Sequence, residues 1–327
     1  MIISRTPLRI SLGGGGTDLP HYYETSGHGF LIAAAISQYI YIAVNRNFES
    51  KILLKYSEIE RTDSVNSVRH PLLRECLREV GLTNHIEISS MADIPAGTGL
   101  GSSGAFAVGV LKALRFAQHQ SDSNLDIAKT ACQIEMVRLG EPVGKQDQYA
   151  SALGGLASFT FHSNGAVDYE PLVLDLNVRS QLEENLLLFY TGIRRSASDV
   201  LGDERRHTET RTVKKNDNLD RTREIGYQTR DTLLRGDLRA FGALLSQQWS
   251  LKYERQPSAT HDAVNRWIQE GVQAGASGGK LVGAGGGGFL LFYAEGKSGV
   301  KQRMLELGLV EVPFNFDYQG STILVSR

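Results

Sequence analysis

Residues 95–105 read Pro-Ala-Gly-Thr-Gly-Leu-Gly-Ser-Ser-Gly-Ala, and the interpretation of the whole chain starts from this stretch. The preceding residues 85–90 alternate isoleucine with polar side chains, as a strand does, and residues 102–117 have the apolar composition of a buried helix. Ser102 and Ser103 occupy N-cap positions, where free N–H groups and the helix dipole favour an anion such as phosphate. The stretch therefore predicts a strand, a phosphate-binding loop and a helix.

Glycine is over-represented, and its surplus is concentrated. The chain has 35 glycines, whereas average usage would give roughly 23. Residues 13–16, 97–104 and 278–288 hold four, four and seven of them. Glycine permits positive φ and lets a ligand approach the backbone closely. Tight turns alone are a weak explanation for three clusters, so we expect the clusters to belong to one binding site.

Composition excludes several classes of protein. The chain has 327 residues, 41% hydrophobic and 22% charged, which is typical of an ordinary globular protein. A net charge of −1 provides no global field for nucleic acid or an anionic membrane. Cys76 and Cys132 are too few for a disulfide framework, so we expect buried thiols in a reducing cytoplasm. Arg5 and Arg9 interrupt the first apolar run, which is therefore no signal peptide, and residues 29–44 fit buried strands better than a membrane span.

The order of predicted elements favours α+β layers over a doubly wound parallel sheet. We expect a soft boundary near residue 175, which divides the chain into residues 1–175 and 176–327. The predicted strands are residues 1–12, 29–45, 51–56, 85–90, 185–190 and 321–325, with a pair around a glycine turn in 280–293. The predicted helices are residues 71–80, 102–117 and 124–139, with four helical patterns between 196 and 273.

Other phosphate loops fit less well. A Walker A loop is absent, and so are the His-Arg-Asp and Asp-Phe-Gly signatures of protein kinases. Gly-x-Gly-x-x-Gly, the dinucleotide fingerprint, matches twice, at residues 99–104 and 283–288, which shows how weak that pattern is. The first match follows almost 100 residues of other structure instead of opening a βαβ unit. An NAD-binding oxidoreductase is therefore the lower-ranked alternative.

Residues 95–105 resemble the ATP-phosphate loop of the GHMP kinases, which include galactokinase, homoserine kinase and mevalonate kinase. Two further motifs agree in order and spacing. Residues 7–18, Pro-Leu-Arg-Ile-Ser-Leu-Gly-Gly-Gly-Gly-Thr-Asp, are similar to the N-terminal sugar-side motif, and residues 280–289, Lys-Leu-Val-Gly-Ala-Gly-Gly-Gly-Gly-Phe, to the C-terminal glycine motif. The resemblance implies a ribosomal S5-like ATP-binding domain over residues 1–175 and a ferredoxin-like C-terminal domain over 176–327.

The resemblance also implies the cofactors ATP and Mg²⁺. The ATP loop residues are then Pro95, Gly97, Gly99, Leu100, Gly101, Ser102, Ser103 and Gly104. Mg²⁺ would be held by Ser103 and Glu135, whose hydroxyl and carboxylate oxygens are hard ligands suited to it. Without the resemblance, Glu135 is better interpreted as a surface charge on a helix.

Residues 144–148, Gly-Lys-Gln-Asp-Gln, resemble the catalytic segment Gly-x-x-Asp-Gln of the sugar kinases in this family. The resemblance implies that Asp147 is the general base and that Arg9 lowers the pKa of the acceptor hydroxyl or neutralises transition-state charge. Phosphoryl transfer depends mainly on positioning and charge neutralisation, so this division of labour is chemically reasonable. The alternative makes Asp147 the N-cap of a helix over residues 148–153, in an enzyme that works without a base.

Residues 6–20 resemble the heptose 7-phosphate kinase and fucokinase branch, because the Gly-Glu-His-Thr-Asp of galactokinases is replaced by Gly-Gly-Gly-Thr-Asp at residues 14–18. The implied reaction phosphorylates the anomeric hydroxyl of D-glycero-D-manno-heptose 7-phosphate to the 1,7-bisphosphate, for nucleotide-heptose and surface polysaccharide synthesis. Alternative acceptors are fucose, another unphosphorylated sugar or an isoprenoid alcohol. The alternative of another class is a sugar-binding regulator that has lost catalysis. The oligomeric state, such as a homodimer, stays open.

The candidate substrate residues fall into three groups. The first group, at the glycine-rich loop of residues 13–18 (the sugar loop) and at the nearby His21, is expected to contact the sugar. The second group consists of basic side chains that are expected to bind a distal phosphate, since guanidinium groups suit phosphate. The third group belongs to the C-terminal glycine motif. The residues are Gly15, Gly16, Thr17, Asp18 and His21; then Lys145, Arg194 and Arg195; then Gly285, Gly286 and Gly287.

Overall fold

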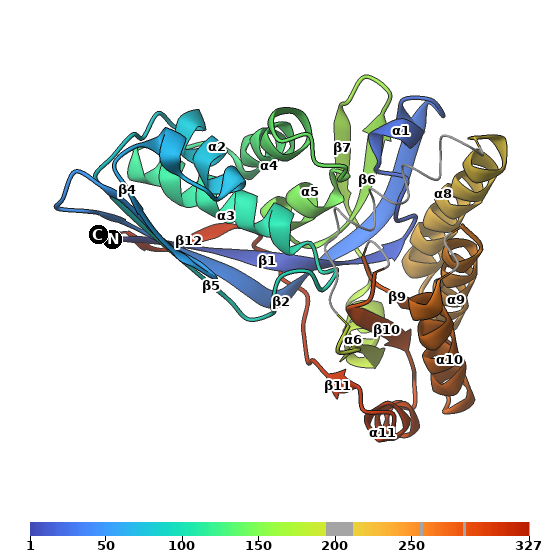
Figure 1. Ribbon diagram of the computed structural model, residues 1–327. Coiled ribbons are helices and arrows are strands. Elements are labelled where there is room, and N and C mark those ends of the chain that lie inside the picture. Colours follow the sequence, from blue (N-terminus) through green and yellow to red (C-terminus); the bar gives the residue numbers. More distant parts are fainter. Residues whose placement is uncertain (194–211, 256–257, 284–285, 327) are drawn as a thin grey trace.

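The computed structural model describes residues 1–193, 212–255, 258–283 and 286–326, which form two β-sheets with their helices (Figure 1). The larger sheet has the order β12-β1-β2-β5-β3-β4, and β6, which also pairs with β2, carries β7. Among the pairings that the described residues make in this sheet, only β3 with β5 is parallel. The expected α+β class is confirmed. The strands are β1 (Ile2–Gly13), β2 (His28–Arg46), β3 (Ile52–Lys55), β4 (Ile59–Thr62), β5 (Ile86–Ala92), β6 (Leu156–His162), β7 (Val167–Pro171) and β12 (Thr322–Ser326).

The strand β2 organises this sheet. Its first part pairs with β6 and its last part with β5, while β1 runs along most of its other side. Residues 30–36, Phe-Leu-Ile-Ala-Ala-Ala-Ile, are all buried, and this continuous apolar run is typical of a strand covered on both faces. After Ile36 the buried side chains alternate with more exposed ones, because one face approaches solvent.

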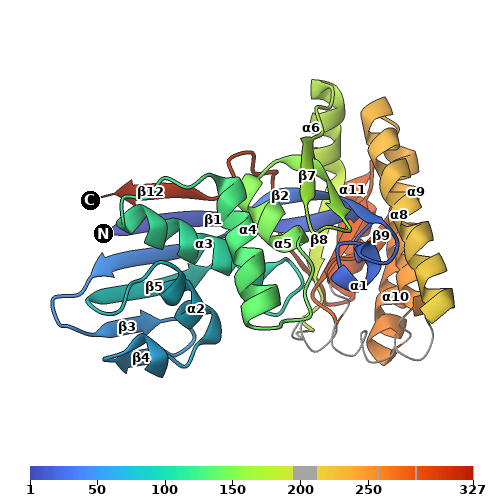
Figure 2. The same cartoon turned by 90° about the horizontal axis from the view of Figure 1, so that it is seen from above.

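Four helices cover one face of the larger sheet (Figures 1 and 2). They are α2 (Pro71–Glu79), α3 (Ser102–Ala117), α4 (Asn124–Cys132) and α5 (Gln146–Leu153). The helix α3 packs closest to the sheet, where a methyl group added at Gly109 would lie 2.9 Å from Oγ1 of Thr6. Cys76 on α2 and Cys132 at the end of α4 are buried, free thiols, as expected.

The second sheet has the order β11-β8-β10-β9 and is antiparallel throughout. The predicted strand pair in residues 280–293 is confirmed as β9 and β10. The strands are β8 (Leu186–Tyr190), β9 (Gly278–Leu281), β10 (Phe289–Tyr293) and β11 (Val310–Glu311). Its helices are α6 (Leu176–Asn185), α8 (Thr212–Arg235), α9 (Leu238–Arg255), α10 (Ala259–Gln273) and α11 (Lys297–Glu306). No helix in the described part of the chain is long and apolar enough to cross a membrane.

The two halves of the chain are interleaved. The helix α8 packs on the larger sheet, where the rings of Tyr227 and Phe30 stack with centroids 4.1 Å apart. The C-terminal strand β12 returns to pair with β1. The division at residue 175 stays a prediction, because α8 and β12 follow this residue in the sequence but pack with the larger sheet.

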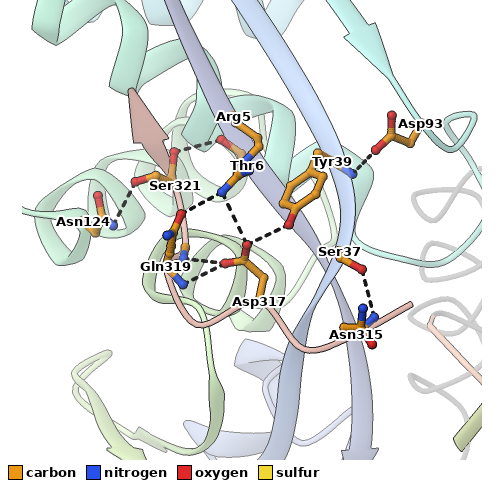
Figure 3. A network of polar contacts seen from close by, with 11 residues as sticks. Arg5, Thr6, Ser37, Tyr39, Asp93, Asn124, Asn315, Asp317, Gln319 and Ser321 are labelled. Atoms are coloured by element: carbon orange, nitrogen blue, oxygen red, sulfur yellow. Dashed lines mark hydrogen bonds and ion pairs between the residues drawn. The ribbon is translucent and has the colours of Figure 1, made fainter. Parts of the chain in front are cut away.

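A polar network fastens the returning C-terminal segment across β1 and β2 (Figure 3). Buried Asp317 accepts hydrogen bonds from the hydroxyl of Tyr39 at 3.0 Å and from the backbone N–H of Gly320 at 2.8 Å. The hydroxyls of Thr6 and Ser321 lie 2.8 Å apart. These contacts hold β1, the strand that also carries Arg9, between β2 and the tail.

Candidate active site

A cavity of about 900 Å³ lies where the three glycine-rich segments meet. Gly15 and Gly16 line it from the first segment, the loop before α3 from the second, and Gly283 from the third. The sequence separates these segments by up to 270 residues, so only the fold brings them together. The expectation that the glycine clusters share one site agrees with this geometry.

The loop before α3 and the first turn of that helix line the cavity. Gly101 is the N-cap residue with φ 77°, and α3 begins at Ser102. The prediction that Ser102 and Ser103 act as N-caps was wrong, because the left-handed backbone at Gly101 ends the loop one residue earlier. The cap supplies no side-chain acceptor, and the first N–H groups of a helix lack intrahelical partners. They can therefore bind a phosphate.

The predicted ATP loop residues divide into two sets. Gly97, Gly99, Gly101, Ser102, Ser103 and Gly104 line the cavity. Pro95 and Leu100 do not line the cavity, and their carbonyls accept hydrogen bonds that hold the loop in place. The carbonyl of Pro95 accepts from the hydroxyl of Thr98 at 2.9 Å, and the carbonyl of buried Leu100 accepts from the N–H of Arg9 at 3.1 Å.

Arg9 and Asp147 form an ion pair beside this loop. The Nη2 and Nε atoms of Arg9 lie 2.6 and 2.8 Å from Oδ1 of Asp147, and Nη1 donates to the carbonyl of Gly99 at 2.8 Å. The helix α5 starts at Gln146 after the N-cap residue Lys145, so the alternative that Asp147 is an N-cap was wrong. Gly104 permits this approach, since a methyl group there would lie 2.7 Å from Cβ of Asp147.

Glu135 lies in the cavity wall, not on the surface. The predicted helix over residues 124–139 changes at Gln133 into a π-helical turn, Gln133–Arg138, and such turns are frequent at functional sites. Glu135 is 2% exposed. Its carboxylate accepts from Oγ of Ser103 at 2.5 Å and from Nε2 of Gln148 at 2.6 Å, while burial raises its pKa to about 7.

Ser103 and Glu135 fit a magnesium ion. They offer hard oxygen donors beside the N–H groups of the loop, and Mg²⁺ is usually bound by one or two carboxylates together with phosphate oxygens and water. Within the described residues no group of three His, Cys, Asp or Glu side chains could hold a metal by itself. A cation here would therefore need the nucleotide phosphates as additional ligands.

Asp18 shares the cavity with Asp147 and contacts Gln146, the residue before it. It is 1% exposed and accepts from the backbone N–H of Gly16 at 3.2 Å and of Gln146 at 3.3 Å. Burial, and then the nearby charge of Asp147, raise the pKa of Asp18 to about 6. A methyl group at Gly144 would lie 1.9 Å from Oδ2 of Asp18, so glycine makes room for this carboxylate.

Other predicted substrate residues lie away from the cavity. Thr17 supports the sugar loop by donating to the carbonyl of Gly14 or Phe30, both at 2.8 Å. His21 lies on the short helix α1 (Pro20–Tyr23) and is not a lining residue. Lys145 donates to the carbonyl of Gly165 at 2.5 Å and lies 5.1 Å above the ring of Tyr23. This ammonium thus binds backbone, and Lys145 is not among the residues that line the cavity.

The third glycine segment mainly packs against the second. A methyl group at Gly283 would lie 2.2 Å from the carbonyl oxygen of Gly99, and one at Gly288 would lie 1.9 Å from that of Thr98. Gly286 and Gly287 do not line the cavity. Arg194, Arg195 and Gly285 lie outside the described residues. The glycines therefore allow two loops to touch backbone to backbone.

Several polar residues of the cavity were missed from the sequence. They are Ser11, Gln146, Gln148, Thr222, Gln248, Lys252, Arg255 and Lys280. Two signals were present: Ser11 is two residues from Arg9 on one strand face, and Lys280 begins the third motif. Nothing in the sequence marked Gln248, Lys252 and Arg255 on α9 as site residues, because a charged helix face is usually exposed to solvent.

Comparisons with known proteins agree with this geometry. Residues 66–155 match the family described as "GHMP kinases N terminal domain", and residues 229–307 match "GHMP kinases C terminal". The chain is 28% identical over 98% of its length to D-glycero-alpha-D-manno-heptose 7-phosphate kinase of Campylobacter jejuni, of which it covers 97%. It is 27% identical over 90% of its length to the bifunctional fucokinase/GDP-fucose pyrophosphorylase of Arabidopsis thaliana, of which it covers 30%.

A solved structure is similar over the whole fold. The crystal structure of a D-glycero-D-manno-heptose 1-phosphate kinase from Bacteroides thetaiotaomicron matches with a TM-score of 0.81 and 25% identity, covering 100% of both chains. Family models in both halves and relatives that span nearly the full chain agree on one assignment, including ATP as the phosphate donor. The chain belongs to the GHMP kinase family and is a sugar kinase that transfers a phosphoryl group to a hydroxyl.

Proposed function

We propose that this kinase phosphorylates the anomeric hydroxyl of D-glycero-D-manno-heptose 7-phosphate to the 1,7-bisphosphate, for nucleotide-heptose and surface polysaccharide synthesis. The observation that carries the proposal is the ion pair of Arg9 and Asp147, which contacts the phosphate-binding loop at Gly99 and lines the same cavity as buried Asp18. A sugar held at Asp18 would have a hydroxyl beside Asp147. The full-length similarity to a heptose 7-phosphate kinase supports this choice of sugar.

In this proposal Asp147 is the general base. It accepts the proton of the acceptor hydroxyl while that oxygen bonds to the terminal phosphorus of ATP, and the bond to the leaving ADP breaks. Arg9 holds Asp147 through Nε and Nη2 and neutralises charge that develops on the phosphoryl group. Since Nη1 of Arg9 also binds the carbonyl of Gly99, the base and the phosphate loop keep a constant separation.

Ser103 and Glu135 would hold Mg²⁺, which supplies charge neutralisation at the phosphates when it is bound. Gln148 orients the Glu135 carboxylate by donating to Oε2. The part of the cavity lined by Tyr56, His70 and Phe106 is rich in rings and apolar side chains and would take the base of the nucleotide.

The experiment is a kinase assay with a panel of phosphorylated and free sugars, with ADP release as the readout. We expect the highest kcat/KM with heptose 7-phosphate, and ³¹P NMR should show a new phosphate ester at the anomeric carbon. The product analysis matters because the two relatives carry names that differ in the phosphorylated position, 7-phosphate in one and 1-phosphate in the other. No turnover of any phosphorylated heptose would refute the proposal.

Fucose is the second candidate acceptor, because the chain is similar over 90% of its length to a bifunctional fucokinase. Fucose carries no phosphate, so the same panel separates the two candidates. A higher kcat/KM with fucose than with heptose 7-phosphate would favour the second. Tight sugar binding without ADP release would instead support the non-catalytic regulator.

A further inference from the structure

The cavity contains a buried cation that the phosphoryl-transfer mechanism above does not use. Lys280 on β9 is 4% exposed, and its Nζ donates to Oε1 of Gln248 at 2.9 Å and to Oγ of Ser11 at 3.2 Å. Both acceptors are neutral, and an ammonium group has three donors. Among the described residues no carboxylate pairs with Lys280. Buried charges are ordinarily paired, so this ammonium lacks an anion.

The charged groups that act on Lys280 are also positive, which increases its need for an anion. Burial, and then the positive charges of Lys252 and Arg9, lower the pKa of Lys280 well below its ordinary value. Three carboxylates of the cavity have other partners: Arg9 for Asp147, Gln146 for Asp18, and Ser103 with Gln148 for Glu135. A bound anion would relieve the repulsion and keep the ammonium charged.

A second cation borders the sugar loop. Gln248, Lys252 and Arg255 recur at helical spacing on α9 and all line the cavity. A methyl group at Gly16 would lie 3.5 Å from Nη2 of Arg255. Arg255 also donates to Oδ1 of Asn218 on α8 at 2.6 Å, which holds the guanidinium in place.

The spacing along β1 separates this region from the point of transfer. Arg9 and Ser11 both line the cavity, and regular pairing with β2 runs through residues 8–11. Residues two apart on a strand lie on one face and are about 6.7 Å apart. Arg9 is the residue at the point of phosphoryl transfer, and Ser11 is the next residue on the same face of β1 toward the sugar loop. Lys280 is hydrogen-bonded to Ser11 and therefore lies on the sugar-loop side of Arg9.

We propose that Lys280 and Arg255, with Gln248 and the Gly15–Gly16 backbone, form the subsite for the phosphate at the distal end of the sugar substrate. This inference rests on the proposed function, since it requires a phosphorylated sugar. It replaces Lys145, which binds the carbonyl of Gly165 instead. Guanidinium and ammonium groups supply charge-assisted hydrogen bonds to phosphate oxygens.

The test compares kcat/KM for heptose 7-phosphate and for the same heptose without phosphate, in wild type, Lys280→Met and Arg255→Gln. Each variant should lose about 10- to 100-fold with the phosphorylated sugar, mainly through KM, and less than about threefold with the free sugar. The KM for ATP should stay constant. Lys112→Met is the matched control, because Lys112 is a partly buried lysine that donates to Asn124 at 2.8 Å and lies outside the cavity.

The outcomes separate the subsite from the proposed function. Equal losses with both sugars, or a raised KM for ATP, would assign Lys280 to the transferred phosphoryl group and overturn the subsite. Wild-type turnover of another phosphorylated sugar, with the same selective losses, would overturn the proposed substrate and support the subsite. Turnover of free sugars alone would overturn both. If Lys280→Met fails to fold, as judged by its circular dichroism melt, Arg255→Gln decides by the same comparison.

Discussion

Replacing Glu135 by glutamine should make the ligand-free kinase more stable at alkaline pH. Burial raises the pKa of Glu135 from 4.5 to about 7 in the folded chain. Between these values the folded chain holds a proton that the unfolded chain has lost, so the free energy of unfolding falls as pH rises and the loss is complete above pH 7. One pKa unit is about 1.4 kcal/mol, which makes the loss about 3 kcal/mol.

Glutamine is uncharged at every pH and avoids this loss. The carboxylate of Glu135 accepts from Ser103 and Gln148, and the amide of a Glu135→Gln variant can keep both bonds if Gln148 flips its own amide. The flip is feasible because Oε1 of Gln148 is buried without a hydrogen-bond partner in the described structure. We therefore expect Glu135→Gln to recover most of the about 3 kcal/mol of unfolding free energy that the wild type loses at alkaline pH.

The assay is thermal unfolding of the protein without nucleotide and Mg²⁺, at pH 5 and pH 8. For 327 residues, 3 kcal/mol corresponds to a Tm difference of about 4 °C at pH 8, and the difference should shrink to about 1 °C at pH 5. Glu184→Gln is the control, since that carboxylate is 70% exposed and the exchange should not change Tm at either pH. A Tm difference that is the same at both pH values would refute the reasoning.

Three further predictions address catalysis, substrate binding and loop packing. Asp147→Asn should lower kcat by at least about 10²-fold if the residue is the base, and near-wild-type turnover would remove it from that role. Asp18 has its pKa raised to about 6 and is charged above that pH, so the KM for sugar in wild type should rise as pH falls below about 6. In Asp18→Asn this pH dependence should disappear, and its persistence would assign it to another group. Gly283→Ala should cost more stability than Gly27→Ala and should also raise the KM for ATP. Both glycines have φ near +82°, but only at Gly283 would the methyl group meet backbone, 2.2 Å from the oxygen of Gly99, and equal melting losses would contradict this packing argument.

Most secondary-structure elements were predictable from local sequence patterns. Alternation and apolar runs identified the strands β1, β2, β5 and β8 and the helices α2 and α3 to within a few residues. The hairpin of β6 and β7 was missed. The helix over residues 124–139 was predicted as one regular element, because periodicity does not reveal the π-helical turn that brings Glu135 into the cavity.

The site was predictable where its chemistry lies within a motif. Arg9, Asp18, Ser103 and Asp147 lie in motifs that resemble those of the family. Glu135 was assigned from the family resemblance alone, and the fold brings all five to one cavity. Lys145 was chosen for its charge and its position two residues before Asp147, yet residues two apart on a helix do not face each other. Its ammonium accordingly binds the carbonyl of Gly165.

The sequence by itself determined the family, the α+β class and the presence of a phosphate-binding loop, because these depend on residue types at fixed short spacings. Only the tertiary structure decided which distant side chains share the cavity. Lys280 and Ser11 are 269 residues apart and in hydrogen-bond contact. Arg255 reaches the sugar loop only because α9 packs beside β1. Burial, which shifts the pKa values of Asp18 and Glu135 and leaves Lys280 in need of an anion, is a property of that packing.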